Sequence, residues 1–203
     1  MTKREHMEYA FSIPFGGMLK EEMNLLYDLS TDKDCIEIGS LIGQSTCVLA
    51  PLAKKVFCID CWSFDSDYNL LDDAMSKDHY SSLHRQLEEK YGKSMFDVFI
   101  DNTNKYEEKI VPIKGDSKEV HKYLNGDSFD LIFIDGDHSY DGTIADYNNF
   151  FSKVKLGGLI CFHDYGGPGW PGVTKAVDEV VSGGKVKLLQ RERTLVVCGK
   201  VCV

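Results

Sequence analysis

The sequence lacks any run of eighteen consecutive apolar residues, and its N-terminus, Met1–Glu8, is polar. A membrane-spanning helix needs about 20 apolar residues, and a secretory signal needs an apolar core. Positive charge is also scarce, since 23 Lys and Arg face 32 Asp and Glu, for a net charge of −9. Affinity for nucleic-acid phosphates and for anionic membranes comes from basic residues. We therefore expect a soluble, cytoplasmic protein that binds neither nucleic acid nor membranes.

Hydrolytic and zinc-dependent chemistry also find little support. No Ser-His-Asp or Cys-His set stands in a suitable context. The seven cysteines include one C-x-x-C pair, Cys58 and Cys61, but a zinc site needs a second well-spaced pair. Because most of the cysteines lie in apolar, strand-like runs, we interpret them as reduced core residues. Zinc or redox chemistry at Cys58 and Cys61 is the alternative.

What the sequence does contain is an alternation of short apolar runs and helical patterns. Such runs are typical of strands buried on both faces of a parallel sheet. The predicted strands are Cys35–Gly39, Val56–Asp60, Ile110–Lys114, Phe129–Asp135, Leu159–His163, Val186–Leu189 and Leu195–Cys198. The predicted helices are Leu19–Leu29, Gln44–Ala50, Ser117–Leu124, Tyr140–Val154 and Val173–Val181. This order predicts an α/β fold with a doubly wound, mostly parallel, Rossmann-like sheet.

The last two predicted strands break the pattern, because only residues 190–194 separate them. No crossover helix fits in so short a connection, so these strands must pair as an antiparallel hairpin. An all-parallel dinucleotide-binding sheet does not end in this way. The hairpin therefore favours a mostly parallel sheet with one antiparallel end.

No repeat, low-complexity tract or linker divides the chain, which predicts one domain over residues 1–203. Residues 1–17 are expected to form an N-terminal arm or lid. The stretch Trp62–Lys109 contains a predicted helix, Tyr80–Tyr91, and we interpret it as an insertion over the carboxyl edge of the sheet, where open α/β folds bind ligands. Its first part, residues 62–80, is an acidic insertion with five acids and one Lys.

A glycine-containing turn follows the first predicted strand and opens directly into a helix. Gly39 lets the backbone turn sharply, and Gly43 lets the helix pack close to the strand. The spacing G-x-x-x-G differs from the dinucleotide fingerprint and from the phosphate loop, and no Lys follows Gly43. Instead the acid Glu37 lies inside the turn. A carboxylate there repels a phosphate and attracts a cation.

Two further acids stand at the ends of the next strands. Asp60 is placed to accept hydrogen bonds from ribose hydroxyls, and Asp116 to accept from an exocyclic amine. Three acids without a phosphate-binding group indicate a ligand with a ribose, amines and a positive centre, and S-adenosylmethionine has all three. The alternative for Asp60 and Asp116 is a role as helix N-caps or turn residues.

Several longer blocks are more specific than the glycine turn. They read E-I-G-S-L-I-G-Q-S-T, V-F-C-I-D-C-W, D-L-I-F-I-D-G-D-H-S-Y-D-G, L-G-G-L-I-C-F-H-D-Y and P-G-V-T-K-A-V-D-E. In this order, over roughly residues 15–200, they resemble the class I S-adenosylmethionine-dependent methyltransferases, nearest to the metal-assisted O-methyltransferases of antibiotics and sugars. The resemblance implies a seven-stranded sheet ending in an antiparallel hairpin. It also implies cofactor contacts, and with their neighbours the predicted cofactor-binding residues are Glu37, Gly39, Gly43, Ser45, Asp60, Asp116, Ser117 and Asp135.

Metal-ligating side chains follow the fourth and fifth predicted strands. If these strands are neighbours, about 4.8 Å apart, then Asp135, His163 and Asp164 converge as a ligand set for one divalent cation. Such a cation lowers the pKa of a substrate hydroxyl and orients the alkoxide. His138 is the predicted general base, and the resemblance implies the same, because relatives carry a basic side chain three residues after the metal-binding Asp. His138 and Asp135 are thus the predicted catalytic residues.

His163 departs from the family pattern, in which two adjacent oxygen ligands are usual. Imidazole accepts Mn, Fe or Zn more readily than Mg, so the identity of the metal stays open. The alternative is that His163 and Asp164 form a hydrogen-bonded pair that closes the site and that His138 caps the next helix.

The sequence thus predicts methyl transfer to a hydroxyl of a small molecule or sugar, assisted by a divalent metal and His138. An NAD(P)-dependent oxidoreductase is one alternative, disfavoured by the missing dinucleotide fingerprint. A non-catalytic S-adenosylmethionine-binding protein is the other, disfavoured by the D-x-x-H and H-D pairs.

The acceptor is expected to contact loops, which do not identify it. The loop Gly166–Gly172 either brings Trp170 over the acceptor or is a passive connection. The aromatic, apolar stretch Tyr9–Phe15 either covers the site or docks on a second subunit of a homo-oligomer. Residues 130–146 hold five acids and no base, and with the acidic insertion they favour a neutral or basic acceptor.

Overall fold

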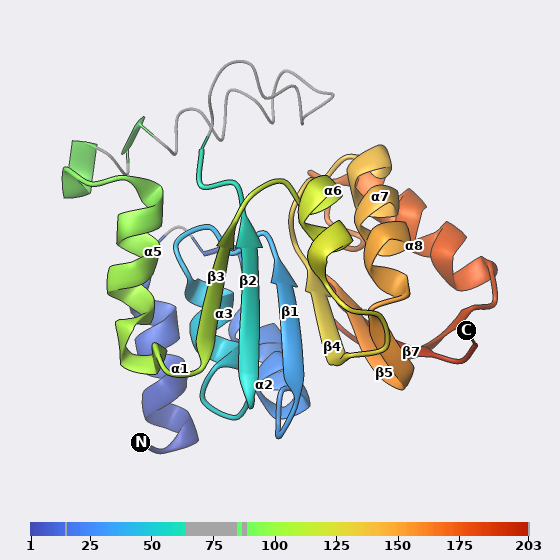
Figure 1. The fold of residues 1–203 in the computed structure, drawn as a ribbon, viewed down its shortest axis with the longest axis horizontal. Coiled ribbons are helices and arrows are strands. Elements are labelled where there is room, and N and C mark those ends of the chain that lie inside the picture. Colours follow the sequence, from blue (N-terminus) through green and yellow to red (C-terminus); the bar gives the residue numbers. More distant parts are fainter. Residues whose placement is uncertain (15, 64–84, 87–88, 203) are drawn as a thin grey trace.

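The computed structural model describes residues 1–14, 16–63, 85–86 and 89–202. The predicted helix Tyr80–Tyr91 and the acidic insertion 62–80 lie mostly outside the described residues. The described residues form a seven-stranded sheet with helices on both faces (Figure 1).

The sheet has the strand order β3-β2-β1-β4-β5-β7-β6. The strands are β1 (Asp34–Ile38), β2 (Lys55–Asp60), β3 (Ile110–Lys114), β4 (Phe129–Ile134), β5 (Val154–Phe162), β6 (Val186–Glu192) and β7 (Leu195–Lys200). The first five are parallel, and β7 runs antiparallel to both β5 and β6. The predicted fold class and the predicted terminal hairpin are therefore confirmed. Because β1 to β5 are parallel, their carboxyl ends share one edge of the sheet.

Two groups of helices cover the two faces of the sheet (Figure 1). One face carries α1 (Lys3–Ser12), α2 (Lys20–Leu29), α3 (Gln44–Leu49) and α5 (Met95–Thr103), and the other carries α6 (Ser117–Val120), α7 (Tyr140–Phe151) and α8 (Pro171–Ser182). Two short 3₁₀ turns, Asn104–Tyr106 and His121–Tyr123, follow α5 and α6. A hydrophobic core lies between the sheet and each group of helices. Alternate residues of β1 pack into the two cores: Cys35 faces the core under α1, α2, α3 and α5, and Ile36 faces the core under α6, α7 and α8. Among the described residues, no helix combines the length and apolarity that a bilayer crossing needs.

The edge strand β3 differs from the expectation that each of the first five strands is buried on both faces. Only Ile110 is buried, and the other four residues alternate between half-buried and exposed positions. It pairs only with β2, on one side, and carries Pro112. Proline lacks an N–H, so it is tolerated at an edge where no neighbouring strand needs that donor.

Two helices were not predicted. Helix α1 begins at a capping box formed by Thr2 and Glu5 and buries Met7 and Ala10, so much of the predicted arm is helical. Helix α5 begins after Ser94, whose hydroxyl accepts from the N–H of Asp97 at 3.2 Å. It buries Met95, Val98 and Phe99, and the ring of Trp62 lies 4.7 Å from that of Phe99. Residues 95–103 therefore belong to the core and do not extend the insertion.

The cysteines are core residues, as interpreted from the sequence. All seven thiols are free, and five of the seven cysteines are buried. Burial raises the pKa of Cys58 well above its ordinary range and that of Cys61 to about 11. Both thiols are therefore protonated at neutral pH, and a protonated thiol is a poor nucleophile and metal ligand.

Candidate functional site

The turn between β1 and α3 is closely packed, which explains its two glycines. Gly39 has φ +89°, and a Cβ there would lie 2.1 Å from the carbonyl oxygen of Asp135. Gly43 has φ +91°, and a Cβ there would lie 2.6 Å from Cγ2 of Thr103 on α5. Only glycine fits both positions. The sequence predicted that Gly43 lets its helix pack close to the preceding strand. In the structure the close neighbour of Gly43 is helix α5 instead.

Glu37 lies under this turn, fully buried. Its Oε2 accepts hydrogen bonds from the hydroxyls of Ser40, at 2.8 Å, and Thr46. The hydroxyl of Ser45, at the start of α3, also lies near this carboxyl. Oε1 is buried and has no hydrogen-bond partner among the described residues. Burial raises the pKa of Glu37, and the three hydroxyls oppose that rise.

Asp60, at the end of β2, holds the backbone of the same turn. Its Oδ2 accepts from the N–H of Leu41 at 2.8 Å, and its Oδ1 accepts from the N–H of Trp62 at 2.7 Å. Burial raises the pKa of Asp60, while these backbone donors favour its ionised form. Each carboxylate oxygen has a second lone pair, so Asp60 can still accept from a ligand.

Asp116 and Ser117 begin α6 at the end of β3. Asp116 is the N-cap, and its Oδ1 accepts from the N–H of Lys118 at 2.8 Å. The Ser117 hydroxyl donates to Oδ1 of Asp146 on α7, at 2.5 Å. A Cβ at Gly136 would lie 3.4 Å from the other oxygen of Asp146. Asp146 therefore lies between the segments that follow β3 and β4.

Asp146 is 2% exposed. Burial raises its pKa to about 7, and the charges of Asp137 and Asp116 act in the same direction. The Ser117 hydrogen bond and the charge of Lys118 oppose that rise. A carboxyl buried without an ion pair is costly once it ionises.

Asp146→Asn should therefore stabilise the protein at alkaline pH. An acid whose pKa is raised on folding binds more protons in the folded state, so stability falls as pH rises from about 4 to about 7. The asparagine variant lacks this loss, and its advantage in the free energy of unfolding should grow by about 2–3 kcal/mol between pH 5 and pH 8. Urea unfolding at both pH values measures it, with the exposed Asp141→Asn as control. An advantage that stays constant with pH would contradict the account of Asp146.

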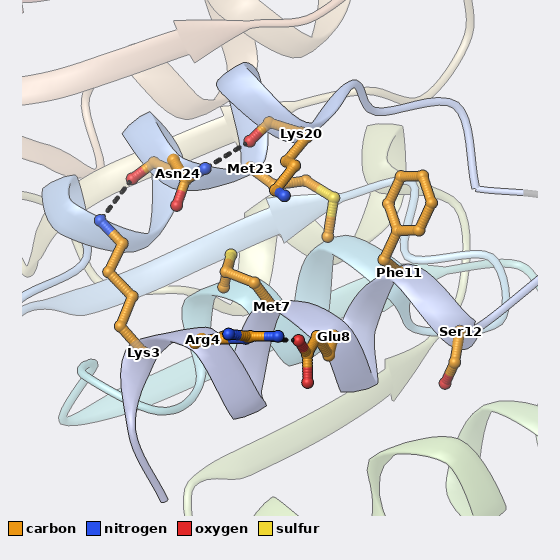
Figure 2. Close-up of a pocket in the computed structure, with 9 residues that line it drawn as sticks. All are labelled: Lys3, Arg4, Met7, Glu8, Phe11, Ser12, Lys20, Met23 and Asn24. Atoms are coloured by element: carbon orange, nitrogen blue, oxygen red, sulfur yellow. Dashed lines mark hydrogen bonds and ion pairs between the residues drawn. The ribbon is translucent and has the colours of Figure 1, made fainter.

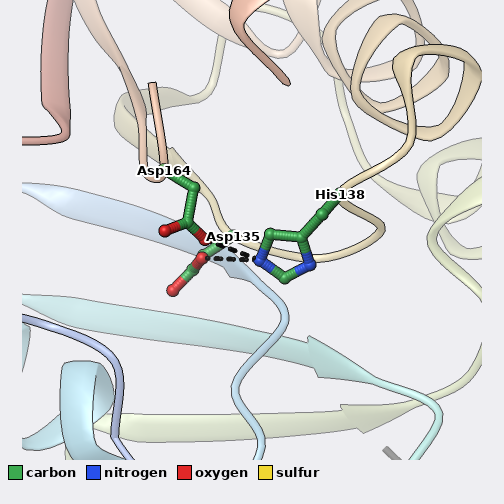
Figure 3. A group of neighbouring side chains, drawn as sticks. All are labelled: Asp135, His138 and Asp164. Atoms are coloured by element: carbon green, nitrogen blue, oxygen red, sulfur yellow. Dashed lines mark ion pairs between the residues drawn. The ribbon is translucent and has the colours of Figure 1, made fainter. Parts of the chain in front are cut away.

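The carboxyl ends of β4 and β5 bring Asp135, His138 and Asp164 together. Both carboxylates point at one edge of the imidazole (Figure 3). His138 Nε2 lies 2.8 Å from Asp164 Oδ2 and 3.5 Å from Asp135 Oδ1. One ligand atom from each residue lies within 4.8 Å of the others, which is close enough to hold one metal ion.

His163 joins this cluster to Glu22 of α2. Its Nδ1 lies 3.1 Å from Asp135 Oδ1 and 3.5 Å from Asp164 Oδ2, and its Nε2 lies 3.4 Å from Glu22 Oε2. Glu22 is fully buried and accepts from the N–H and the hydroxyl of Thr194 at 2.7 and 2.6 Å. The carboxylate of Glu22 is thus fixed from two sides, and it orients the ring of His163.

The cluster pairs imidazoles with ionised acids. Burial alone would raise the pKa of Glu22, but hydrogen bonds led by that of His163 outweigh it and lower the pKa to about 2. Burial alone would lower the pKa of both imidazoles, but Asp135 and Asp164 raise that of His138 to about 9 and that of His163 well above its ordinary range. The same contacts overcome burial and lower the pKa of Asp135 and Asp164.

Trp170 covers His138. The two rings are stacked, with centroids 4.4 Å apart and 28° between the planes. Trp170 lies at the end of the Gly- and Pro-rich loop and immediately precedes α8. His138 does not cap α7, because Ser139 is the N-cap and accepts from the N–H of Gly142 at 2.9 Å.

Sequence reasoning placed most of this site but missed two buried acids. Asp135, His138, His163 and Asp164 converge, and the predicted cofactor residues line the neighbouring strand ends. Glu22 and Asp146 were not identified. A signal existed for both, because each lies four residues before a buried apolar residue, Glu22 before Leu26 and Asp146 before Phe150.

A separate groove of about 820 Å³ lies between α1 and α2 (Figure 2). The residues that line it are Lys3, Arg4, Met7, Glu8, Phe11, Ser12, Lys20, Met23 and Asn24. Two of its cations are paired, Lys3 with Asp28 at 2.6 Å and Arg4 with Glu8 at 2.7 Å. None of the predicted site residues lines this groove, so it is distinct from the candidate site at the carboxyl ends of β1 to β5.

A known protein family matches the part of the chain that carries the site. The family described as "Methyltransferase domain" matches residues 36–165, which include all the predicted cofactor-binding, catalytic and metal-ligating residues but not Glu22, Trp170 or Thr194. The curated "Uncharacterized protein R132" of Acanthamoeba polyphaga mimivirus is 40% identical over 78 residues, covering 38% of this chain and 32% of that protein. The chain therefore matches about a third of the length of this relative.

Solved structures share the fold over nearly the whole chain. The O-methyltransferase NovP gives a TM-score of 0.69 at 17% identity, covering 97% of this chain and 88% of that one. The SAH-bound methyltransferase PaMTH1 of Podospora anserina gives a TM-score of 0.62 at 16% identity, covering 99% of this chain and 88% of that one. At these identities the likeness shows the fold, and it agrees with the topology described above.

Proposed function

The chain belongs to the methyltransferase-domain family, with a class I S-adenosylmethionine-dependent methyltransferase fold, and on this premise we propose that it methylates a hydroxyl group of a small molecule or sugar. His138 and a divalent cation assist the transfer. The observation that carries the proposal is the convergence of Asp135, His138, His163 and Asp164 at the ends of β4 and β5, beside the turn that we assign to the cofactor.

The buried acids support the cofactor assignment. Glu37 Oε1 has no partner among the described residues, and an orphaned buried acceptor costs about 1–3 kcal/mol. The ammonium group of S-adenosylmethionine, directly or through one water, would supply the missing donor. Asp60 would accept from the ribose hydroxyls, and Asp116 with Ser117 would bind the exocyclic amine. When bound, the cofactor supplies an electrophilic methyl group on a sulfonium.

The residues also fit a divalent cation. Asp135 and Asp164 offer carboxylate oxygens, and we assign His163 as the third ligand through Nδ1. Ligating histidines commonly donate their other N–H to a carboxylate, and Nε2 of His163 faces Glu22. Such a cation would lower the pKa of the acceptor hydroxyl and hold its oxygen in place.

His138 would then take the hydroxyl proton at Nε2, the nitrogen that faces Asp135 and Asp164. Bound S-adenosylmethionine would supply its methyl group to the acceptor oxygen, in line with the sulfur, and would leave as S-adenosylhomocysteine once the S–CH₃ bond is broken. With its pKa at about 9, His138 keeps a proton at neutral pH while both carboxylates stabilise its charge. A cation held by those carboxylates would lower the pKa of His138 and let it act as a base, so the proposed role of His138 depends on the proposed cation.

Transfer of a labelled methyl group from S-adenosylmethionine to a panel of hydroxylated small molecules and sugars tests the function. Product should appear with a neutral or basic acceptor, because residues 130–146, which hold five acids and no base, repel anionic acceptors. Labelled product from an amine or a nucleic acid, with none from any hydroxyl compound, would contradict the proposal.

Chelation should abolish this transfer. Removing the cation takes away the Lewis acid and leaves His138 protonated, so EDTA should reduce turnover by about 100-fold or more. Added Mn²⁺, Fe²⁺, Zn²⁺ or Mg²⁺ should restore it, and the best of them identifies the metal. Turnover that is indifferent to EDTA would instead favour a hydrogen-bonded pair of His163 and Asp164.

A further inference from the structure

Asp146 is a buried acid for which the proposed chemistry has no use. Among the described residues its side chain forms no ion pair, and its only hydrogen-bond partner is the hydroxyl of Ser117, at 2.5 Å. Replacement by asparagine would keep the shape and remove the cost of burying a charge. Asp146 lies between the segments that follow β3 and β4. A carboxyl at this position indicates that the Ser117 hydroxyl, which it contacts, needs an acceptor.

The contact decides which way Ser117 can bond. A serine hydroxyl has one proton to donate and two lone pairs that accept. Because the proton is directed at Asp146 Oδ1, Ser117 Oγ can only accept from a ligand. The side-chain oxygens of Asp116 next to it are also acceptors, and one of them already receives the N–H of Lys118.

We infer that Asp146 is a positioning residue that makes the nucleobase end of the site selective for a 6-amino purine over a 6-oxo purine, by holding the Ser117 hydroxyl in its accepting orientation. This inference rests on the proposed cofactor site at Asp116 and Ser117. A 6-amino group brings two N–H donors to the Ser117 hydroxyl and the Asp116 carboxyl. A 6-oxo group brings an acceptor, whose lone pairs repel those of the two side chains. Sites built around such hydrogen bonds reject mismatched ligands strongly, because buried polar groups are left unpaired.

Asparagine at position 146 should reverse the orientation. Its side-chain N–H₂ can donate to Ser117 Oγ, which frees the serine proton to donate to a 6-oxo group. Ser117→Ala removes the oriented hydroxyl altogether and should also reduce selectivity. A purely structural role for Asp146 predicts a different result, namely equal weakening of both purines.

The experiment is calorimetric titration of S-adenosylhomocysteine and of its inosine counterpart, S-inosylhomocysteine, at about pH 8.5, where Asp146 is ionised. The wild type should prefer the adenine ligand by about 100-fold or more, and Asp146→Asn by about tenfold or less, with tighter binding of the inosine ligand. Asp141→Asn, an exposed acid on the same helix, should keep the wild-type ratio.

An unchanged ratio in Asp146→Asn, or equal weakening of both ligands, overturns the inference. If that variant does not fold, Ser117→Ala decides alone, and a wild-type ratio there overturns it too. Failure of the proposed function looks different, because the wild type would then bind neither ligand.

Discussion

His138→Ala and Asp135→Ala should each reduce methyl transfer by about 10³-fold, and His138→Ala should change the affinity for S-adenosylhomocysteine by less than about fivefold. The first removes the proton acceptor of the proposed reaction. The second removes a proposed metal ligand that also lies 3.1 Å from His163 Nδ1. The measurement is single-turnover transfer of labelled methyl, with calorimetric titration of S-adenosylhomocysteine on the same preparations.

Asp141→Ala is the matched control for both variants. Asp141 lies in the first turn of α7, close in sequence to the cluster, but its side chain is exposed. Its turnover should equal that of the wild type. Wild-type turnover in both His138→Ala and Asp135→Ala would remove the roles assigned to these residues, and a fall in Asp141→Ala would point to a general effect of charge.

Asp60→Ala should weaken the binding of S-adenosylhomocysteine by about 100-fold or more. The proposed ribose contacts are hydrogen bonds to a charged acceptor, each worth about 1.5–3 kcal/mol. The variant also frees the N–H groups of Leu41 and Trp62, which Asp60 holds at 2.8 and 2.7 Å, so the turn loses its shape. Calorimetric titration gives the change in affinity.

Two comparisons separate the ribose contacts from the shape of the turn. Asp97→Ala removes an exposed acid that accepts from Ser94 at the start of α5, and it should bind S-adenosylhomocysteine like the wild type. A ligand without the ribose hydroxyls, such as the 2′,3′-dideoxy analogue, should lose less affinity in Asp60→Ala than S-adenosylhomocysteine does, and the loss that remains measures the shape of the turn. Undiminished binding of S-adenosylhomocysteine by Asp60→Ala would place the cofactor elsewhere.

The fold could be predicted from the sequence because its strongest constraints are local: the pattern of apolar and polar residues and the lengths of the connections. Short apolar runs separated by helical patterns leave few topologies other than a doubly wound sheet. Residues 190–194 are too few for a crossover, which fixes β6 and β7 as a hairpin. The exposed positions of β3 could not be read in the same way, since the order of strands in the sheet, and hence its edge, depends on long-range contacts.

Helices α1 and α5 were not predicted, for two different reasons. Helix α1 has a weakly segregated, mostly polar sequence, so its residues Met7 and Ala10 give little periodic signal. Helix α5 has a clear apolar spacing in Met95, Val98 and Phe99, but it follows a long polar and acidic stretch that we interpreted as one insertion. Its partner Trp62, 33 residues earlier than Met95, could not be found by local patterns.

The candidate site was predictable where chemistry and strand ends coincide. Asp60, Asp135 and His163 end or follow apolar runs, and parallel strands bring such positions to one edge. Glu22 and Asp146 act from helices, behind the residues that they orient, and a single acid among apolar neighbours reads as a surface residue. Their partners are far away in the sequence, His163 for Glu22 and Ser117 for Asp146.

Titration of S-adenosylhomocysteine into the wild-type protein tests the central claim most directly. The account predicts saturable binding with one site per chain and a dissociation constant in about the micromolar range. The same titration with NAD should show none, because the turn after β1 lacks the dinucleotide fingerprint. Binding of NAD, with no binding of S-adenosylhomocysteine at millimolar concentration, would contradict the account.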